Sequence, residues 1–104
     1  MPSNTTFSVF YFVYVLESVR DGKRYIGYTH DLKKRFSEHV SSLVRSTRNR
    51  LPLKLVYFEA CIYKEDAKRR EHYLKTTQGR RFLGLRIQEY IRAKRLGPKV
   101  DILG

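Results

Sequence analysis

Hydrophobic residues are concentrated in one continuous stretch near the beginning of the chain. Val9 to Leu16 reads Val-Phe-Tyr-Phe-Val-Tyr-Val-Leu and is apolar on both faces, which predicts a central, buried strand. The stretch is shorter than the ~20 residues of a membrane span, and no lysine or arginine precedes Arg20. We therefore expect a buried strand, and neither a membrane segment nor a signal peptide.

The same pattern predicts two further strands. Arg20 to Lys23 is a turn signal and Arg24 to Tyr28 predicts a short second strand, so that the first two strands form an antiparallel hairpin. Lys54 to Ile62 contains the run Leu-Val-Tyr-Phe and predicts a third strand.

Helical spacing marks the segment between the second and third strands. Thr29 or Asp31 is suited to cap a helix that runs to about Leu43. The apolar positions that we expect on its inner face are Leu32, Phe36, Val40 and Leu43.

The last third of the chain also has helical character. A second helix is expected from Lys64, with acidic residues in its first turn, and the segment Thr76 to Gly79 breaks it. A third helix is expected from Arg80 to about Arg95, and Gly97 ends it.

The resulting order is strand, strand, helix, strand, helix, helix. It predicts an α/β (α+β) fold in which a small three-stranded antiparallel sheet is flanked by helices. A chain of 104 residues is expected to form one domain. We expect a flexible N-terminus over residues 1–8, the domain over 9–95 and a C-terminal tail over 96–104.

Charge narrows the class of partner. The chain has 22 lysines and arginines against 10 acidic residues, a net charge of +12, and the excess is present in both halves of the chain. Such an excess in a small protein most often serves to bind a polyanion. Cys61 is the only cysteine, which excludes an intrachain disulfide and favours a reducing, cytoplasmic environment.

Glu71 is the first candidate for chemistry. On its helix it shares a stripe with Ala67 and Leu74, so a carboxylate occupies a position that should face the sheet. An unpaired buried carboxylate is costly, which suggests a partner or a metal ion. The alternatives are an ion pair with a nearby arginine, or a rotated stripe that leaves Glu71 in water.

Four more residues stand out by position. Arg35 and His39 are four apart on the first helix and should lie at the rim of its apolar stripe, reaching over the sheet. Tyr14 and Tyr25 lie on the two strands of the hairpin. The simpler interpretation is a half-exposed arginine, a hydrogen-bonded histidine and two core tyrosines.

Taken together, these residues resemble a known family. Phe12-Val13-Tyr14, then Tyr25-Ile26-Gly27, then Arg35, His39 and Glu71 follow the spacing of the GIY-YIG endonuclease superfamily. Thr47-Arg48, Pro52 and Leu55-Val56-Tyr57 further resemble its stand-alone, single-domain bacterial members. The first motif departs from Gly-Ile-Tyr, and the asparagine that many relatives carry after the metal-binding helix is absent, since Asn occurs here only at positions 4 and 49.

The resemblance implies metal-dependent hydrolysis of DNA phosphodiester bonds. It implies that Glu71 holds one divalent metal, Mg²⁺ or Mn²⁺, and that Tyr14 is the general base, helped by His39 or by a metal-bound hydroxide. Arg35 then stabilises charge on the phosphate, and Tyr25 orients the attacking water or hydrogen-bonds the phosphate. Structure-selective or weakly selective cleavage, and a role in DNA repair or recombination, are expected from the relatives.

Basic residues outside this group are candidates for gripping the nucleic-acid backbone. Contacts to phosphate grip without reading sequence, so little base specificity is expected. DNA is the expected partner, RNA is an alternative, and a protein partner could supply targeting. The candidate nucleic-acid-binding residues are Lys34, Arg45, Arg48, Arg50, Lys68 and Arg70.

A second class of function fits the same charge. A non-catalytic nucleic-acid-binding module on the same scaffold would keep the basic surface and lack the hydrolytic chemistry. The two readings differ at Glu71, which only the nuclease needs for cleavage.

Overall fold

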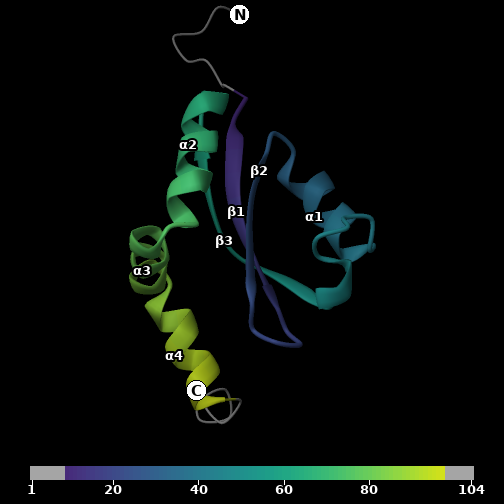
Figure 1. Ribbon diagram of the computed structural model, residues 1–104, viewed down its shortest axis with the longest axis vertical. Helices are drawn as coiled ribbons and strands as arrows, with labels where there is room; N and C mark the ends of the chain where they lie inside the picture. Colours follow the sequence, from purple (N-terminus) through teal and green to yellow (C-terminus); the bar gives the residue numbers. More distant parts are fainter. Residues whose placement is uncertain (1–8, 98–104) are drawn as a thin grey trace, which may run out of the picture. The chain divides into compact units, whose positions relative to one another are not determined.

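A computed structural model describes residues 9–97 and confirms the predicted fold class. Within these residues the chain forms a three-stranded antiparallel sheet flanked by helices (Figure 1). The elements in chain order are β1 (Tyr11–Ser18), β2 (Arg24–Thr29), α1 (Leu32–Val40), the 3-10 turn η1 (Arg48–Arg50), β3 (Leu53–Cys61), α2 (Lys64–Leu74), α3 (Thr77–Arg86) and α4 (Gln88–Leu96).

The chain divides into two compact units at the boundary between His72 and Tyr73. The first unit contains the sheet, α1 and most of α2, and the second contains α3 and α4. The single domain over residues 9–95 stays a prediction. The flexible N-terminus that we expect over residues 1–8 lies outside the described residues, as does the part of the expected tail over residues 98–104.

The predicted buried strand β1 is the centre of the sheet. The strand order is β2-β1-β3, and β1 pairs antiparallel with both neighbours. It begins two residues later than the apolar run predicts and extends through Glu17 and Ser18, both buried. The two polar residues belong to the strand because each has a partner: Glu17 accepts a hydrogen bond from Arg24 at 3.1 Å, and Ser18 Oγ accepts from the turn backbone.

Helix α1 begins where the sequence predicts and ends early. Asp31 caps it by accepting a hydrogen bond from the backbone N–H of Lys34. The helix stops at Val40 because Ser42 adopts a left-handed conformation with φ of 66°. The predicted inner face is therefore wrong at its end: Val40 is 42% exposed and Leu43 75%.

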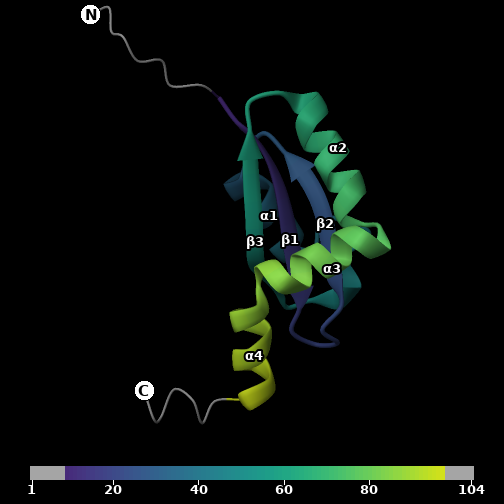
Figure 2. The same ribbon diagram turned by 90° about the vertical axis from the view of Figure 1, so that its left-hand side faces the viewer.

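Helices α1 and α2 lie on opposite faces of the sheet. Figure 1 shows the sheet between them, and Figure 2 shows α2 in front of the strands with α1 behind. Ala67 of α2 is fully buried, as its place on the predicted stripe requires. The Tyr14 side chain of β1 reaches His39 of α1, so Tyr14 projects from the face of the sheet on which α1 lies.

The second unit corrects the prediction of one long helix over Arg80 to Arg95. Thr76 caps a new helix by accepting a hydrogen bond from Gly79 N–H at 3.0 Å, so α3 begins at Thr77 inside the expected break. The chain then leaves the helical region at Ile87, with φ of −115° and ψ of 32°, and α4 begins directly afterwards. A buried β-branched residue is a poorer helix former, which suits this bend.

None of the helices in the described part of the chain is both long enough and apolar enough to cross a membrane.

Candidate active site

Three aromatic rings meet on one face of the sheet. The strand register places Tyr14 opposite Gly27 and Leu16 opposite Tyr25, so the two tyrosines project from the same face. His39 of α1 reaches both: its ring centroid lies 5.7 Å from that of Tyr14 and 5.1 Å from that of Tyr25. The residues predicted from two strands and one helix therefore form one cluster.

Gly27 makes room for the Tyr14 hydroxyl. A Cβ added at Gly27 would lie 2.6 Å from the Tyr14 hydroxyl oxygen, closer than such atoms approach in proteins. The Tyr14 ring therefore lies across the backbone of β2, and its hydroxyl reaches His39, with 2.9 Å between Oη and Nε2. The glycine of the second motif thus has a steric role in this site.

His39 is fully buried, which corrects the expectation that it lies at the rim of the helix. Because α1 ends at Val40, the inner side of its last turn is occupied by His39 in place of the exposed Val40. Both ring nitrogens are used: Nε2 faces Tyr14, and Nδ1 lies 2.7 Å from Thr47 Oγ1. His39 is therefore a hydrogen-bonded histidine, as the simpler interpretation of the sequence has it, and it also lies inside the candidate site.

Arg35 lies one turn before His39 and remains partly exposed, with 37% of its side chain accessible. Its guanidinium donates to Glu38 Oε1 at 3.0 Å and to the Tyr14 side chain. The hydrogen bond to Tyr14 is the main cause that raises the pKa of Arg35 above its usual value. Arg35 is thus a permanent cation at the open side of the cluster.

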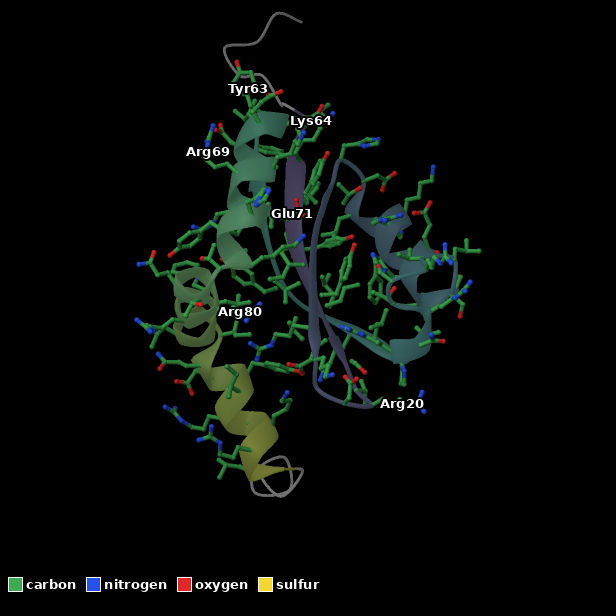
Figure 3. The ribbon with its side chains drawn as sticks, viewed as in Figure 1. Arg20, Tyr63, Lys64, Arg69, Glu71 and Arg80 are labelled. Atoms are coloured by element: carbon green, nitrogen blue, oxygen red, sulfur yellow. The ribbon has the colours of Figure 1, made fainter. Side chains whose placement is uncertain are left out.

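Glu71 projects from α2, which flanks the other face of the sheet. It is half-buried between the fully buried Ala67 and Leu74, as the predicted stripe requires. Figure 3 shows its side chain between α2 and the strands β1 and β2. Its negative charge is among the causes that raise the pKa of Tyr14, so the carboxylate lies within electrostatic range of the phenol.

Two pKa values in the cluster are shifted by burial. Burial raises the pKa of Tyr14 above its usual value, and the hydrogen bond from Arg35 opposes that shift. Burial also lowers the pKa of His39, and the Arg35 charge acts in the same direction. At neutral pH the protein by itself therefore holds a protonated tyrosine against a neutral imidazole.

The side chains of the site fit a divalent cation that is weakly bound by the protein alone. Among residues 9–97 no three histidine, cysteine or acidic side chains converge as a metal cage would require. Glu71 offers one carboxylate, and Mg²⁺ is commonly bound by one or two carboxylates with water and substrate phosphate completing its shell. The residues present therefore fit a cation that is completed by substrate.

A cleft of about 520 Å³ opens beside Arg35. Its lining includes cationic and aromatic side chains, which suit the backbone and bases of a nucleic-acid strand, and two acidic ones, Asp31 and Glu38, of which Glu38 is paired with Arg35. Lys34 lines the cleft. Its contact with nucleic acid stays a prediction. The cationic lysine and arginine residues and the tyrosines of this lining are Tyr11, Tyr28, Lys34, Arg35 and Lys64.

The other predicted nucleic-acid contacts differ in their surroundings. Arg45, Arg48 and Lys68 are exposed, and Arg50 is half-buried. Arg70 is held by Glu59 of β3 through two hydrogen bonds of 2.8 and 2.9 Å. Its guanidinium therefore ties α2 to the sheet, and its role as a phosphate contact stays a prediction.

Sequence reasoning did not include Thr47 among the site residues. Its side chain is fully buried and contacts His39, although the two residues are eight positions apart on either side of a loop. The signal that could have found it is the Thr47-Arg48 pair, one of the features by which the chain resembles stand-alone GIY-YIG proteins.

An antiparallel hairpin carries the paired tyrosines, and the helix that follows it carries the arginine and the histidine. A profile of the GIY-YIG catalytic domain matches residues 10–83. The chain therefore belongs to the GIY-YIG family.

Several UPF0213 proteins are among the relatives that match. The chain is 46% identical over 65 residues to one from Streptococcus pneumoniae serotype 4, a match covering 62% of this chain and 65% of the relative, just under two thirds of its length. It is 43% identical over 70 residues to one from Streptococcus pyogenes serotype M3, covering 66% and 75%. The solution NMR structure of a UPF0213 protein from Bacillus halodurans matches with a TM-score of 0.51 and 34% identity, covering 78% of this chain and 89% of that one.

Proposed function

We propose that this protein is a metal-dependent endonuclease that hydrolyses DNA phosphodiester bonds with little sequence specificity, and that it is selective for branched or nicked structures. The observation that carries the proposal is the approach of Tyr14, Tyr25, Arg35 and His39 within one cluster, with Glu71 in electrostatic range. The GIY-YIG match supports the class of chemistry.

Arg35 is the residue we assign to the phosphate. Attack on phosphorus increases the negative charge on the phosphoryl oxygens, and a guanidinium with parallel N–H donors matches their geometry. Arg35 is held in place by Glu38 and Tyr14 and still keeps a third of its side chain accessible beside the cleft. It can therefore meet a substrate without losing its orientation.

Tyr14 is the residue we assign as general base, which accepts the proton of the attacking water at Oη. Its raised pKa means that the phenol keeps its proton in the free protein at neutral pH. Before Tyr14 can accept a proton from water, its own proton must pass to His39 Nε2 or to solvent, and positive charge near Oη, part of it from Arg35, favours that release. Tyr25, whose ring centroid lies 6.3 Å from that of Tyr14, is placed to orient the water or to hydrogen-bond the phosphate.

Glu71 is the residue we assign to one divalent cation, Mg²⁺ or Mn²⁺. When bound, such a cation supplies positive charge that stabilises the transition state of phosphoryl transfer. Glu71 would hold the cation, and its carboxylate already lies within electrostatic range of Tyr14. One carboxylate is a weak site by itself, so we expect the cation to bind more tightly when a substrate phosphate is present.

The DNA backbone is proposed to follow the cationic residues. Lys34 lies in the cleft beside Arg35, and Arg45, Arg48 and Lys68 are exposed cations. Contacts of this kind bind phosphate without reading bases, as expected of an enzyme that recognises the shape of DNA and not its sequence. We further propose a cytoplasmic protein that acts in DNA repair or recombination, with a protein partner for targeting.

The experiment compares cleavage and binding by Glu71→Gln. This substitution keeps the size and hydrogen-bonding ability of the side chain and removes its charge, so cleavage of nicked, branched and linear DNA in Mg²⁺ or Mn²⁺ should be abolished. The affinity for the same DNA should be retained, because phosphate contacts come from other residues. Gel assays of products and a fluorescence binding titration measure the two quantities.

The matched control is Glu65→Gln, which removes an exposed carboxylate from the same helix and should leave cleavage unchanged. Full activity of Glu71→Gln would remove the metal role of that residue. If the unaltered protein binds DNA tightly and cleaves none of these substrates with either cation, the non-catalytic nucleic-acid-binding module is the correct function.

A further inference from the structure

We infer that the unit formed by α3 and α4 binds the phosphate backbone of duplex DNA through arginines that the proposed active site does not use. The inference goes beyond the proposed function, because it concerns binding alone and does not require cleavage. The four arginines that carry it are Arg80, Arg81, Arg86 and Arg95.

Positive charge is denser in the second unit than in the first. Residues 73–97 hold seven lysines and arginines and one acidic residue, whereas residues 9–72 hold fourteen and eight. The net charge is +6 in each range, and the second range carries it on fewer than half as many residues. Like charges held this close repel one another and destabilise a folded unit, so a bound polyanion relieves a cost that the free unit bears.

The cations of the second unit point to solvent because apolar residues occupy its inner side. The buried positions Gly79, Leu83 and Ile87 recur every four residues along α3 and at its end. Tyr90 and Ile91 continue this inner side into α4 and are half-buried. All seven cations of residues 73–97 are exposed, so they are accessible to a large anionic partner.

The exposed arginines of this unit differ in whether they have a partner. Arg92 pairs with Glu89, the acidic residue of this range, at 2.6 Å, and Lys94 lies 5.4 Å from the centre of the Tyr90 ring. A guanidinium without an acidic partner is available for bidentate hydrogen bonds to phosphate oxygens. Among residues 9–97, no acidic side chain forms an ion pair with Arg80, Arg81, Arg86 or Arg95.

Helix stability does not account for all four arginines. Arg86 and Arg95 lie in the last turns of α3 and α4, where positive charge interacts favourably with the helix dipole. Arg80 and Arg81 lie toward the N-terminal end of α3, where the same dipole disfavours a cation. Their charge therefore needs another explanation, and contact with phosphate supplies it.

Helix α4 lies beyond the part of the chain that the family profile matches. The profile ends at residue 83, inside α3, and α4 spans Gln88–Leu96. Figure 2 shows α4 following α3 directly at a bend. Arg86 and Arg95 lie after the matched part, so the binding that we infer for this unit is not carried over from the GIY-YIG domain.

An anionic membrane is the competing partner, and the exposed side chains favour DNA. A helix that lies in a membrane surface needs a continuous apolar face that it can bury in lipid. Helices α3 and α4 each leave one large apolar side chain exposed, Leu85 and Leu96, among several exposed cations. Single apolar side chains of this kind are ordinary on a protein surface, so charge is the feature that a partner can recognise.

The salt dependence of DNA binding tests the inference. A variant with Arg→Gln at all four positions is compared with the unaltered protein by fluorescence anisotropy on duplex DNA, without divalent cation, between about 50 and 200 mM NaCl. Each lost phosphate contact lowers the slope of log K against log salt by ~0.9, so the slope should fall by about three to four. Over this range the affinity of the unaltered protein should fall about 100-fold more than that of the variant.

The matched control removes the same amount of charge from the first unit. It carries glutamine at four exposed positions to which we assign no DNA contact, and its slope should change by about one or less. Equal losses of slope in the two variants would overturn the inference, because total charge would then explain the binding. The control positions are Arg20, Lys23, Lys54 and Arg69.

A charge-conserving variant separates binding from folding. Arg→Lys at the same four positions keeps the charge and should keep the salt slope of the unaltered protein. If the lysine variant binds as weakly as the glutamine variant, the loss comes from structure and the inference is wrong. It is also wrong if the glutamine variant keeps the DNA slope and loses binding to vesicles of phosphatidylglycerol, since the partner is then a membrane. If the unaltered protein shows the expected slopes and cleaves no DNA, the proposed function fails and this inference stands.

Discussion

Burial lowers the pKa of His39 in the folded protein, which makes the stability of the protein depend on pH. Its lowered pKa means that the folded protein resists the proton that the unfolded chain binds below pH ~6.5, the ordinary value for histidine. The unfolded state therefore binds more protons in that range. Stability should rise with pH through it, and should fall as the solution is acidified from pH 7.5 to pH 5.

Urea unfolding at pH 7.5, 6 and 5 measures this effect. His39→Gln should lose less of its unfolding free energy on acidification than the unaltered protein does. His72→Gln, which removes an exposed histidine, is the matched control and should follow the unaltered protein. An equal decrease in His39→Gln would show that another group carries the pH dependence.

Motif and spacing single out the five catalytic candidates without knowledge of the fold. Tyr14 and Tyr25 share a face because strand alternation requires it once the register is set. Periodicity could not predict the contact of Thr47 with His39, because it depends on the path of the loop after Val40 and loops carry no periodic signal; only the family resemblance of the Thr47-Arg48 pair pointed to this position.

The ends of the strands were predicted better than the ends of the helices. The three strands were predicted within two residues, since alternation and turn signals mark both ends. The end of α1 and the bend between α3 and α4 were not, because they depend on local backbone conformations at Ser42 and Ile87. Apolar spacing continues through both positions and gives no sign of either break.

The pair formed by Glu59 and Arg70 links β3 to α2, and its removal should destabilise the first unit. The pair has two short hydrogen bonds, and Glu59 is also bound by the Tyr57 hydroxyl at 2.7 Å. Arg70→Ala should lower the unfolding free energy by about 1–2 kcal/mol, because a partly buried carboxylate loses its charged donor.

Lys68→Ala is the matched control, since Lys68 lies on the same helix and is exposed. It should change the unfolding free energy by less than about 0.5 kcal/mol. It should also weaken DNA binding and lower the salt dependence of log K by about one phosphate contact. Equal stability of the two variants would show that the Glu59–Arg70 pair contributes nothing to the fold.

In the molecule as a whole, the proposed catalytic residues and the proposed DNA contacts differ in how far they are buried. The cluster around Tyr14 uses buried and half-buried groups from β1, β2, α1 and α2, whereas several of the proposed phosphate contacts are exposed. The net charge of +12 predicts a polyanionic partner from composition alone. Which of the cations contact DNA could not be derived from composition, because net charge does not fix the path of a bound strand.

The rate at which Tyr14→Phe cleaves branched DNA in Mg²⁺ or Mn²⁺ tests the proposed chemistry most directly. This variant keeps the ring that packs on His39 and Tyr25 and removes only the hydroxyl, and Tyr63→Phe removes the same group from an exposed position as a control. We expect Tyr14→Phe to bind DNA normally and to cleave ~10²–10⁴-fold more slowly than the unaltered protein, with Tyr63→Phe unaffected. Cleavage by Tyr14→Phe at the rate of the unaltered protein would contradict the assignment of Tyr14 as the base.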